Sequence, residues 1–431
     1  MEKAPEMTRS PHPIHDFHYK AGELFCEGVK VSSIVKTTGT PAYIYSHKTL
    51  VDHFNKIKAA FDEVDPLICF AMKANSNLAV LKALVSAGAG FDIVSGGELR
   101  KARLVGADVR KIVYASVGKT DAEIADAIKA GILLFNVESS PELENIERIA
   151  GSMKKTVQVA LRINPDVQAP THDKINTGSL KKKFGIDLST ARGIFLGQKK
   201  YKHLLINGVH IHIGSQITEG APFLKAIRRA LAFIDGLARE GVRVTYFDIG
   251  GGLGIIYSDE KPQTAKEFAN RVLPLLKGRA LRLIMEPGRF IVGNAGIFVT
   301  RKLYTKDNGV KKFMIVDGGM NDLVRPSMYG AHHEIIPLER SAARKIVCDV
   351  VGPICESGDV FAHDRKLPDI ADGKCLALLS AGAYGYSMAS NYNVRPRASE
   401  VMVKGDRWAV VQARETFRDL VKGAHIPAFL K

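Results

Sequence analysis

The sequence has few cysteines and no long apolar segment. Its five cysteines are scattered and include no C-x-x-C pair (Cys26, Cys69, Cys348, Cys355 and Cys375), which argues against a disulfide framework or a zinc site. No apolar run approaches the ~20 residues that span a bilayer, and the N-terminal segment lacks the apolar core of a signal peptide. We therefore expect a cytoplasmic protein with no membrane association and no metal.

The composition is that of an ordinary globular protein. Apolar residues make up 46% of the chain and charged residues 25%, which excludes disorder and fibrous repeats. The formal net charge is +16, from 61 Lys and Arg against 45 Asp and Glu. These basic residues are spread along the chain without a recognisable binding module, so we expect no nucleic-acid partner. At 431 residues the chain is long enough for two or three domains.

Between residues 67 and 290 the chain repeats one unit. A short, β-branched apolar run is followed by a segment with helical periodicity, which is typical of βα units in a parallel sheet. Eight strands of this kind close a barrel. The eight runs are 67–72, 91–94, 111–116, 133–138, 157–164, 208–213, 246–250 and 281–286.

The texture changes after residue 290 to shorter alternating runs separated by Gly, Asn, Asp and Pro, which predicts a second, mostly β domain. The fold class expected is therefore α/β, a (β/α)₈ barrel plus a β-rich C-terminal domain. We predict the barrel over 41–290, the β domain over 291–431, and an N-terminal segment, 1–40, that pairs with the β domain. The irregular segment 168–185 has the length of a loop that could act as a lid.

Polar groups follow the apolar runs, where the active site of such a barrel is built. Lys73 ends the first run, where partial desolvation would favour the neutral amine of Schiff-base chemistry; a solvated strand-end lysine is the alternative. The glycines at 250–252 could surround a phosphate with backbone N–H groups or serve a purely structural turn. Glu286 and Arg289 follow the eighth run and could also form a structural pair.

Two histidines lie in the sixth run. His210 and His212 have the spacing that places both on one face of a strand. They could hold a metal, but no third ligand has a convincing spacing. We favour stacking of His212 on a planar cofactor.

Six motifs, in this order, resemble the fold-type III pyridoxal-phosphate enzymes, which have an alanine-racemase-like barrel. The motifs are F-x-x-K-A-N (70–75), G-F-D-I-V-S-G-G-E-L (90–99), K-F-G-I (183–186), H-I-G-S-Q (212–216), D-I-G-G-G (248–252) and E-P-G-R (286–289). The resemblance runs from about Gly22 to nearly the C-terminus. It implies a pyridoxal 5'-phosphate cofactor and a decarboxylase activity.

The resemblance also implies roles for individual residues. Lys73 would carry the cofactor, His212 would stack on its ring and Glu286 would pair with its pyridinium nitrogen. The other cofactor-binding positions that it implies are Asp92, Ser215, Gly250, Gly251, Gly252, Gly288, Arg289 and Tyr384.

Within this family, three segments resemble the diaminopimelate decarboxylases: 325–329, 355–359 and 382–393. Their substrate, meso-2,6-diaminopimelate, has a second amino-acid head whose carboxylate needs a cationic receptor, and arginines can bind it in bidentate geometry. The substrate-binding residues implied are Arg289, Arg325, Tyr329, Glu356 and Tyr384. By the same resemblance Cys355 would donate a proton after carbon dioxide leaves, and its motif would reach the active site of the other subunit in a homodimer.

The sequence therefore predicts decarboxylation of meso-2,6-diaminopimelate to L-lysine and carbon dioxide, the last step of lysine biosynthesis by that pathway. Related decarboxylases acting on carboxynorspermidine, ornithine or arginine are the alternative. An amino-acid racemase on the same barrel has a different set of motifs. A regulatory protein derived from a decarboxylase would have lost residues such as Lys73 and Glu286.

Overall fold

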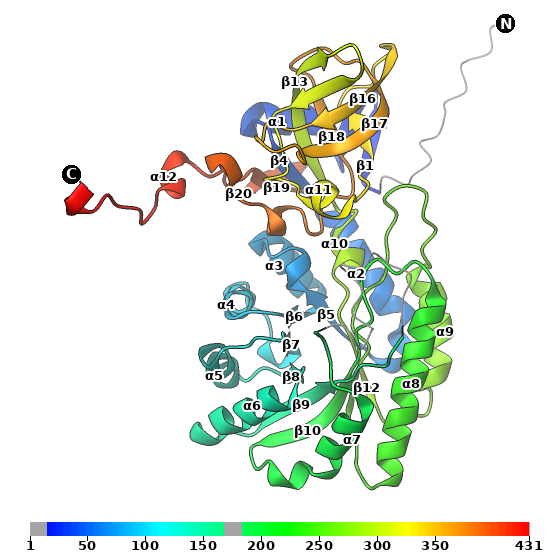
Figure 1. The fold of residues 1–431 in the computed structure, drawn as a ribbon. Coiled ribbons are helices and arrows are strands. Elements are labelled where there is room, and N and C mark those ends of the chain that lie inside the picture. Colours follow the sequence, from blue (N-terminus) through cyan, green and yellow to red (C-terminus); the bar gives the residue numbers. More distant parts are fainter. Residues whose placement is uncertain (1–14, 168–182, 431) are drawn as a thin grey trace, which may run out of the picture.

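A computed structural model describes residues 15–167 and 183–430 of the chain. It contains a barrel ringed by helices and a β-rich domain stacked on one end of it (Figure 1). Most of the apolar core is continuous between the two, with Phe70 and Phe91 in the barrel and Phe298 in the β domain belonging to one buried cluster. In the part of the chain that the structure describes, no helix has the length and apolar character needed to cross a membrane.

The barrel is closed by eight parallel strands, in the order β10-β11-β12-β5-β6-β7-β8-β9. The strands are β5 (Leu67–Ala71), β6 (Gly90–Ile93), β7 (Ile112–Ala115), β8 (Leu134–Val137), β9 (Val157–Arg162), β10 (Leu204–His210), β11 (Tyr246–Asp248) and β12 (Arg282–Met285). The helices around them are α2 (His47–Ala60), α3 (Leu78–Ala87), α4 (Gly96–Leu104), α5 (Asp121–Ala130), α6 (Ser140–Ser152), α7 (Leu188–Leu196), α8 (Gly220–Arg239) and α9 (Ala265–Leu276). The predicted fold class is confirmed.

Each predicted apolar run overlaps a barrel strand, and the largest difference is in the sixth. The run at 208–213 was expected to be the strand, whereas β10 begins at Leu204 and ends at His210. The strand therefore ends before His212, which lies on the loop beyond it. The alternation continues past the strand because Ile211 and Ile213 are still buried after the ladder has ended.

Local sequence signals set the starts of several helices. Thr120 and Thr264 each form a capping box with the glutamate three residues later, Glu123 and Glu267. The hydroxyl of Ser46 accepts a hydrogen bond from the backbone N–H of Thr49 at the start of α2. These caps satisfy N–H groups that have no partner within the helix.

The β domain is built around a sheet that runs β17-β16-β14-β13-β4-β19-β20, with β18 pairing β13 and β15. Its strands are β4 (Ala42–Ser46), β13 (Gly296–Asp307), β14 (Lys312–Val316), β15 (Ile335–Pro337), β16 (Lys345–Val351), β17 (Val360–Pro368), β18 (Cys375–Leu378), β19 (Ser399–Lys404) and β20 (Arg407–Gln412). The short helices α10 (Arg289–Val292), α11 (Arg325–Tyr329) and α12 (Phe417–Leu420) also lie in this half of the chain. Strand β4 joins this sheet although it precedes the barrel strands in sequence.

The N-terminal residues pack on the β domain. A small sheet of β1 (Phe17–Lys20), β2 (Glu23–Cys26) and β3 (Val29–Lys30) is followed by α1 (Val31–Thr38). The backbone N–H of Leu24 donates to the carbonyl of Leu338 at 2.7 Å. Phe17 and Leu24 share a buried cluster with Ile297 and Val401.

The β domain covers the end of the barrel at which β5 stops. The backbone N–H of Tyr384 donates to the carbonyl of Ala74 at 2.8 Å, and the side chain of Asn75 donates to the carbonyl of Gly382 at 3.0 Å. The β domain therefore packs over the carboxyl ends of the barrel strands. Most of the predicted site residues lie between these two parts.

Candidate active site

Lys73 lies just beyond β5, in the turn Met72–Ala74. Its Nζ atom is 2.8 Å from Oδ2 of Asp92, which is fully buried in β6. Burial by itself would lower the pKa of Lys73, but the carboxylates of Asp92 and Glu286 outweigh it, and the pKa is raised. The expectation that desolvation favours the neutral amine is therefore wrong for this structure, because the ion pair stabilises the ammonium form.

Asp92 is the nearest acidic partner of this lysine. Burial and the negative charge of Glu286 raise the pKa of Asp92 to about 7, although the Lys73 ammonium opposes the shift. Its Oδ1 atom is buried and has no hydrogen-bond partner among the described residues. The lysine thus sits beside a carboxyl group that can gain or lose a proton near neutral pH.

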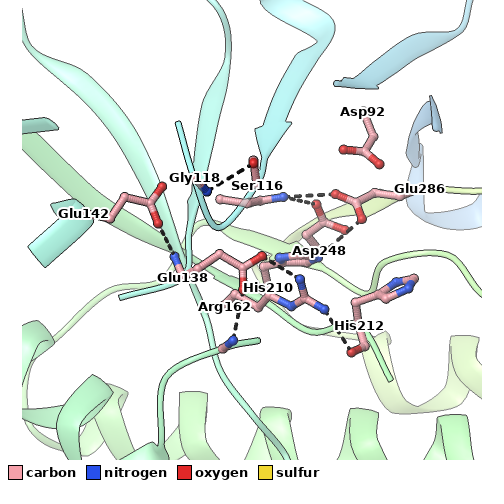
Figure 2. A network of polar contacts seen from close by, with 12 residues as sticks. Asp92, Ser116, Gly118, Glu138, Glu142, Arg162, His210, His212, Asp248 and Glu286 are labelled. Carbon is pink, nitrogen blue, oxygen red and sulfur yellow. Dashed lines mark hydrogen bonds and ion pairs between the residues drawn. The ribbon is translucent and has the colours of Figure 1, made fainter. Parts of the chain in front are cut away.

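Glu286 follows β12 and is the centre of a buried polar cluster, shown in Figure 2. The side-chain amide of Asn136 donates to Glu286 at 3.0 Å and to Asp248 at 3.2 Å. His210 Nε2 lies 3.3 Å from Glu286 Oε2. Burial would raise the pKa of Glu286, but His210 and Lys73 hold it below its usual range, so this carboxylate remains ionised.

Asp248, on the neighbouring strand β11, behaves in the opposite way. Burial and the negative charge of Glu286 raise its pKa well above the ordinary value. Its Oδ1 atom accepts a hydrogen bond from the backbone N–H of Gly250 at 2.9 Å, which ties it to the glycine turn. Of the two buried carboxyls, Glu286 carries the negative charge.

His210, Asp248 and Glu286 also form the only group of three possible metal ligands found among the described residues. Their ligand atoms lie within 4.8 Å of one another. His210 therefore has two possible partner ligands, Asp248 and Glu286. Spacing in the sequence did not reveal them, because it is the neighbouring strands β10, β11 and β12 that bring the three residues together. The contact of His210 with Glu286, and the bonds from Asn136 to both carboxyls, engage the same side chains with one another.

The glycine turn after β11 packs closely against its neighbours. A Cβ atom on Gly251 would lie 2.1 Å from the carbonyl oxygen of Glu286, and one on Gly252 would lie 2.3 Å from that of Gly214. Gly250 and Gly252 also have positive φ angles, of 67° and 103°. The structural role considered for this turn is therefore real, and it places backbone groups beside Glu286 and His212.

His212 lies on the loop after β10 and is held at both its ring and its backbone. Its Nδ1 atom accepts a hydrogen bond from the N–H of Gly251 at 3.3 Å. Desolvation and the neighbouring Arg162 guanidinium keep the pKa of His212 well below its usual value, so the ring is neutral. A neutral, partly buried imidazole beside the Glu286 cluster suits stacking on a planar ring.

Arg162 and Glu138 form a buried pair that supports this loop (Figure 2). Arg162 Nη1 donates to Glu138 Oε1 at 2.6 Å, and Arg162 Nη2 donates to the carbonyl of His212 at 3.4 Å. The other oxygen of Glu138 accepts a hydrogen bond from the backbone N–H of Gly185 at 2.9 Å. The pair thus connects the His212 loop to the chain at Gly185; residues 168–182 of the predicted lid lie outside the described part.

A cluster of cationic side chains lies on the β-domain side of the site. Arg289 and Arg325 are both buried, and their guanidinium carbons lie 5.7 and 4.7 Å from the centre of the Tyr257 ring. Arg289 donates to Tyr257 Oη at 2.5 Å and to Ser215 Oγ at 3.1 Å. It also lies 4.9 Å from the centre of the Tyr384 ring.

These two arginines have no acidic partner in the part of the chain that the structure describes. None of the ion pairs found among the described residues involves Arg289 or Arg325, and the Nε atom of Arg289 is buried without a hydrogen-bond partner. Arg289 therefore does not form the structural pair with Glu286 that the sequence left open. A buried charge without a counter-charge costs free energy. The two buried guanidinium groups of Arg289 and Arg325 are therefore suited to binding an anion.

Cys355 and Glu356 lie apart from this cluster. Both are exposed, on the turn between β16 and β17, and the N–H of Cys355 donates to the side chain of Asn393 at 2.7 Å. No hydrogen bond or ion pair among the described residues joins either of them to Lys73 or Glu286. The single chain therefore does not bring together all the residues named from the sequence. Tyr329, by contrast, lies on α11 near Arg289.

Four residues that contribute to the site were not singled out from the sequence: Asn136, Arg162, Tyr257 and His333. Asn136 and Arg162 lie within the predicted strands, whereas the polar groups first considered lie at the ends of those strands or beyond them. Tyr257 and His333 lie in loops without a recognisable motif. Polar residues in the last two positions of each strand are a signal that would have identified Asn136 and Arg162.

The residues present fit pyridoxal phosphate. An amine at a strand end faces a carboxylate that stays ionised, as a protonated pyridine nitrogen requires. The buried, unpartnered Nε of Arg289 and the hydroxyl of Ser215 offer hydrogen-bond donors for an anion. Gly288 packs within 3.1 Å, measured from a Cβ built on it, of Ala71 and Ala74 beside the lysine, so a side chain here would crowd that turn.

Comparison with known proteins agrees with this geometry. Residues 47–293 match the family described as "Pyridoxal-dependent decarboxylase, pyridoxal binding domain". The proteins named diaminopimelate decarboxylase from Aquifex aeolicus and Pseudomonas aeruginosa are 46% and 45% identical to the chain. The alignments cover 97% and 94% of this chain, and 99% and 98% of those proteins.

Solved structures show the same arrangement. Diaminopimelate decarboxylase from Helicobacter pylori, complexed with L-lysine, has a TM-score of 0.88 at 40% identity, covering 91% of this chain and 98% of that one. Diaminopimelate decarboxylase from M. jannaschii, also in complex with L-lysine, has a TM-score of 0.92 at 36% identity, covering 96% and 99%. With its lysine–carboxylate cluster, its glycine turn and these relatives, the chain belongs to the diaminopimelate decarboxylase family of pyridoxal-dependent decarboxylases.

Proposed function

We propose that the protein is a pyridoxal-phosphate-dependent decarboxylase that converts meso-2,6-diaminopimelate to L-lysine and carbon dioxide. The observation that carries this proposal is the pair of buried arginines, Arg289 and Arg325, beside the Lys73–Glu286 cluster. Neither arginine has an acidic partner among the described residues. Tyr384 connects the two parts, because it raises the pKa of Lys73 and its ring lies against Arg289. A substrate with a second, distal carboxylate would neutralise the positive charge of these arginines.

The cofactor would be held by residues from four strand ends. Lys73 would bind it covalently, and Glu286 would face its ring nitrogen while His212 lies against the ring. Its phosphate would be held by Ser215 and the backbone at Gly250, Gly251, Gly252 and Gly288, with Arg289 alongside through its contact with Ser215. When bound, pyridoxal phosphate supplies a ring that accepts the electrons of the bond to the departing carboxylate.

The charges of the protein support this chemistry. The ionised Glu286 would stabilise a proton on the ring nitrogen, and the neutral His212 would add no competing positive charge. Asp92 lies 2.8 Å from the Lys73 amine and stabilises its ammonium form. These two carboxyls therefore control the charge on either side of the reacting group.

The distal head of the substrate would be read by charged and aromatic groups. Arg289 and Arg325 would bind its carboxylate, and the hydroxyls of Tyr329 and Tyr384 would donate hydrogen bonds. Glu356 would pair with its ammonium group. Ornithine and arginine have one carboxylate each. Loss of that carboxylate as carbon dioxide would leave Arg289 and Arg325 without an anionic partner.

Cys355 would return a proton to the carbon that has lost carbon dioxide, and we propose that it does so across a homodimer. Two facts support an active site completed by a second copy: Cys355 is exposed, and the described residues of its own chain do not connect it to Lys73. We also place the enzyme in the cytoplasm, where its five unpaired cysteines would stay reduced.

The test is release of carbon dioxide and lysine from meso-diaminopimelate by purified protein with added pyridoxal phosphate. Ornithine, arginine and carboxynorspermidine are run in parallel. Lysine formed from diaminopimelate, with no product from the other three, is the expected result. Product from ornithine or arginine alone would refute the proposed substrate.

A further inference from the structure

His333 links Arg325 to the backbone of the β domain at Leu379. It lies between α11 and β15, is fully buried, and bonds through both ring nitrogens. Nδ1 is 2.8 Å from the carbonyl oxygen of Leu379, and Nε2 is 2.9 Å from Nη1 of Arg325. The ring also packs edge-on against Tyr257, with centroids 5.4 Å apart.

These two contacts define the protonation of the ring. A carbonyl oxygen can only accept a hydrogen bond, so Nδ1 must carry the hydrogen. A guanidinium group can only donate, so Nε2 must be the acceptor from Arg325. His333 is therefore a neutral imidazole in a single tautomer. Burial and the positive charge of Arg325 agree with this, because they lower the pKa of His333 to about 3.

A neutral acceptor has a different effect on Arg325 from that of a carboxylate. The imidazole holds the guanidinium by one hydrogen bond and leaves its positive charge uncompensated. Arg325 lies near a second cation, Arg289, and the pKa of Arg325 is lowered by burial and by this like charge, although the Tyr257 ring opposes the shift. An aspartate or glutamate at 333 would orient the guanidinium equally well but would cancel the charge that attracts an anion.

We propose that His333 is a positioning residue that presents Arg325, with its charge intact, to the distal carboxylate of the substrate. The inference rests on the proposed function and adds a determinant of substrate specificity to it. The same carboxylate remains in the product, because L-lysine retains the amino-acid head that does not react. Cadaverine, the corresponding diamine, lacks it.

The test compares three substitutions of His333 in the complete enzyme with bound cofactor. In His333→Gln the side-chain amide oxygen can still accept from Arg325. In His333→Leu the acceptor is lost, and in His333→Glu it is kept but carries a negative charge. His203→Leu is the matched control, because His203 lies before β10, at the opposite end of the barrel, and bonds Glu147.

We expect His333→Gln to keep the KM for meso-diaminopimelate within about twofold, and His333→Leu to raise it about tenfold, the effect of a hydrogen bond to a charged group. His333→Glu should raise KM by at least as much. In both impaired variants kcat and the visible absorption of bound cofactor should change little. Inhibition by L-lysine should weaken in parallel with KM, while inhibition by cadaverine stays as in the wild type.

The inference is overturned if His333→Glu binds diaminopimelate and lysine as tightly as the wild type, or if cadaverine inhibition weakens equally. It is also overturned if His333→Gln is as impaired as His333→Glu, since a purely structural need for imidazole would then explain both. Should His333→Leu fail to fold, this Gln-to-Glu contrast still decides the question. Wild-type enzyme that forms no lysine would refute the proposed function itself, a result distinct from any pattern among the variants.

Discussion

The buried pair of Arg162 and Glu138 offers a sharp test of what holds the site together. Glu138→Gln removes the negative charge and leaves the Arg162 guanidinium buried, with side-chain exposures in the wild type of 7% for Arg162 and 3% for Glu138. Breaking a buried pair in this way costs about 3–5 kcal/mol. The amide oxygen of glutamine can still accept one hydrogen bond, so we expect the lower end, about 3 kcal/mol.

The matched control is Glu240→Gln, which breaks an exposed pair with Arg192 on the barrel surface. An exposed pair contributes about 0–1 kcal/mol, so this variant should unfold almost as the wild type does. Both proteins are unfolded in urea at one fixed protein concentration, because the stability of the proposed homodimer would depend on concentration.

The variant should also affect the cofactor site. Arg162 donates to the carbonyl of His212, and Glu138 accepts from Gly185. Glu138→Gln should therefore weaken retention of pyridoxal phosphate during dialysis, whereas Glu240→Gln should not. Equal unfolding free energies for the two variants would refute the assignment of Glu138 and Arg162 as a support of the site.

Three further predictions follow from the site and the core. Lys73→Ala should abolish both the visible absorption of bound cofactor and lysine formation; a variant that keeps the absorption band would contradict the role of Lys73. Cys355→Ala should keep the band and slow turnover at least tenfold, and full activity would disprove that Cys355 is the proton donor. Burial raises the pKa of Asp322 to about 7, so its folded form favours the bound proton, and the stability this gives should be lost as the pH rises from about 4 to 7. Asp322→Asn should flatten that part of the stability curve measured by urea unfolding; an unchanged curve would show that Asp322 does not titrate there.

The fold could be predicted to a large extent because barrel strands are local patterns. An apolar run of four to eight residues that is buried on both faces is visible in the sequence, and all eight runs overlap a strand. The end of β10 was misplaced because Ile211 and Ile213 stay buried beyond the ladder, so the alternating pattern outlasts the strand.

The site could be predicted only where a residue type stands at a strand end. Lys73 and Glu286 were found in this way, and in the structure the half-buried Lys73 interacts with the buried Glu286. The charge state of Lys73 could not be predicted, because it depends on Asp92, which is nineteen residues away in sequence but 2.8 Å away in space. A desolvation argument made from one strand alone therefore gave the wrong sign.

The sequence by itself determined the elements, the order of the motifs and the kind of chemistry, since these depend on residue types and short spacings. The tertiary structure alone decided which charges meet. Among the residues with a described structure, it left Arg289 and Arg325 without a carboxylate partner, gave Arg325 a neutral histidine as its partner, and placed Cys355 away from Lys73 within the same chain. Electrostatic interactions depend on distance and burial, and both are properties of the folded chain.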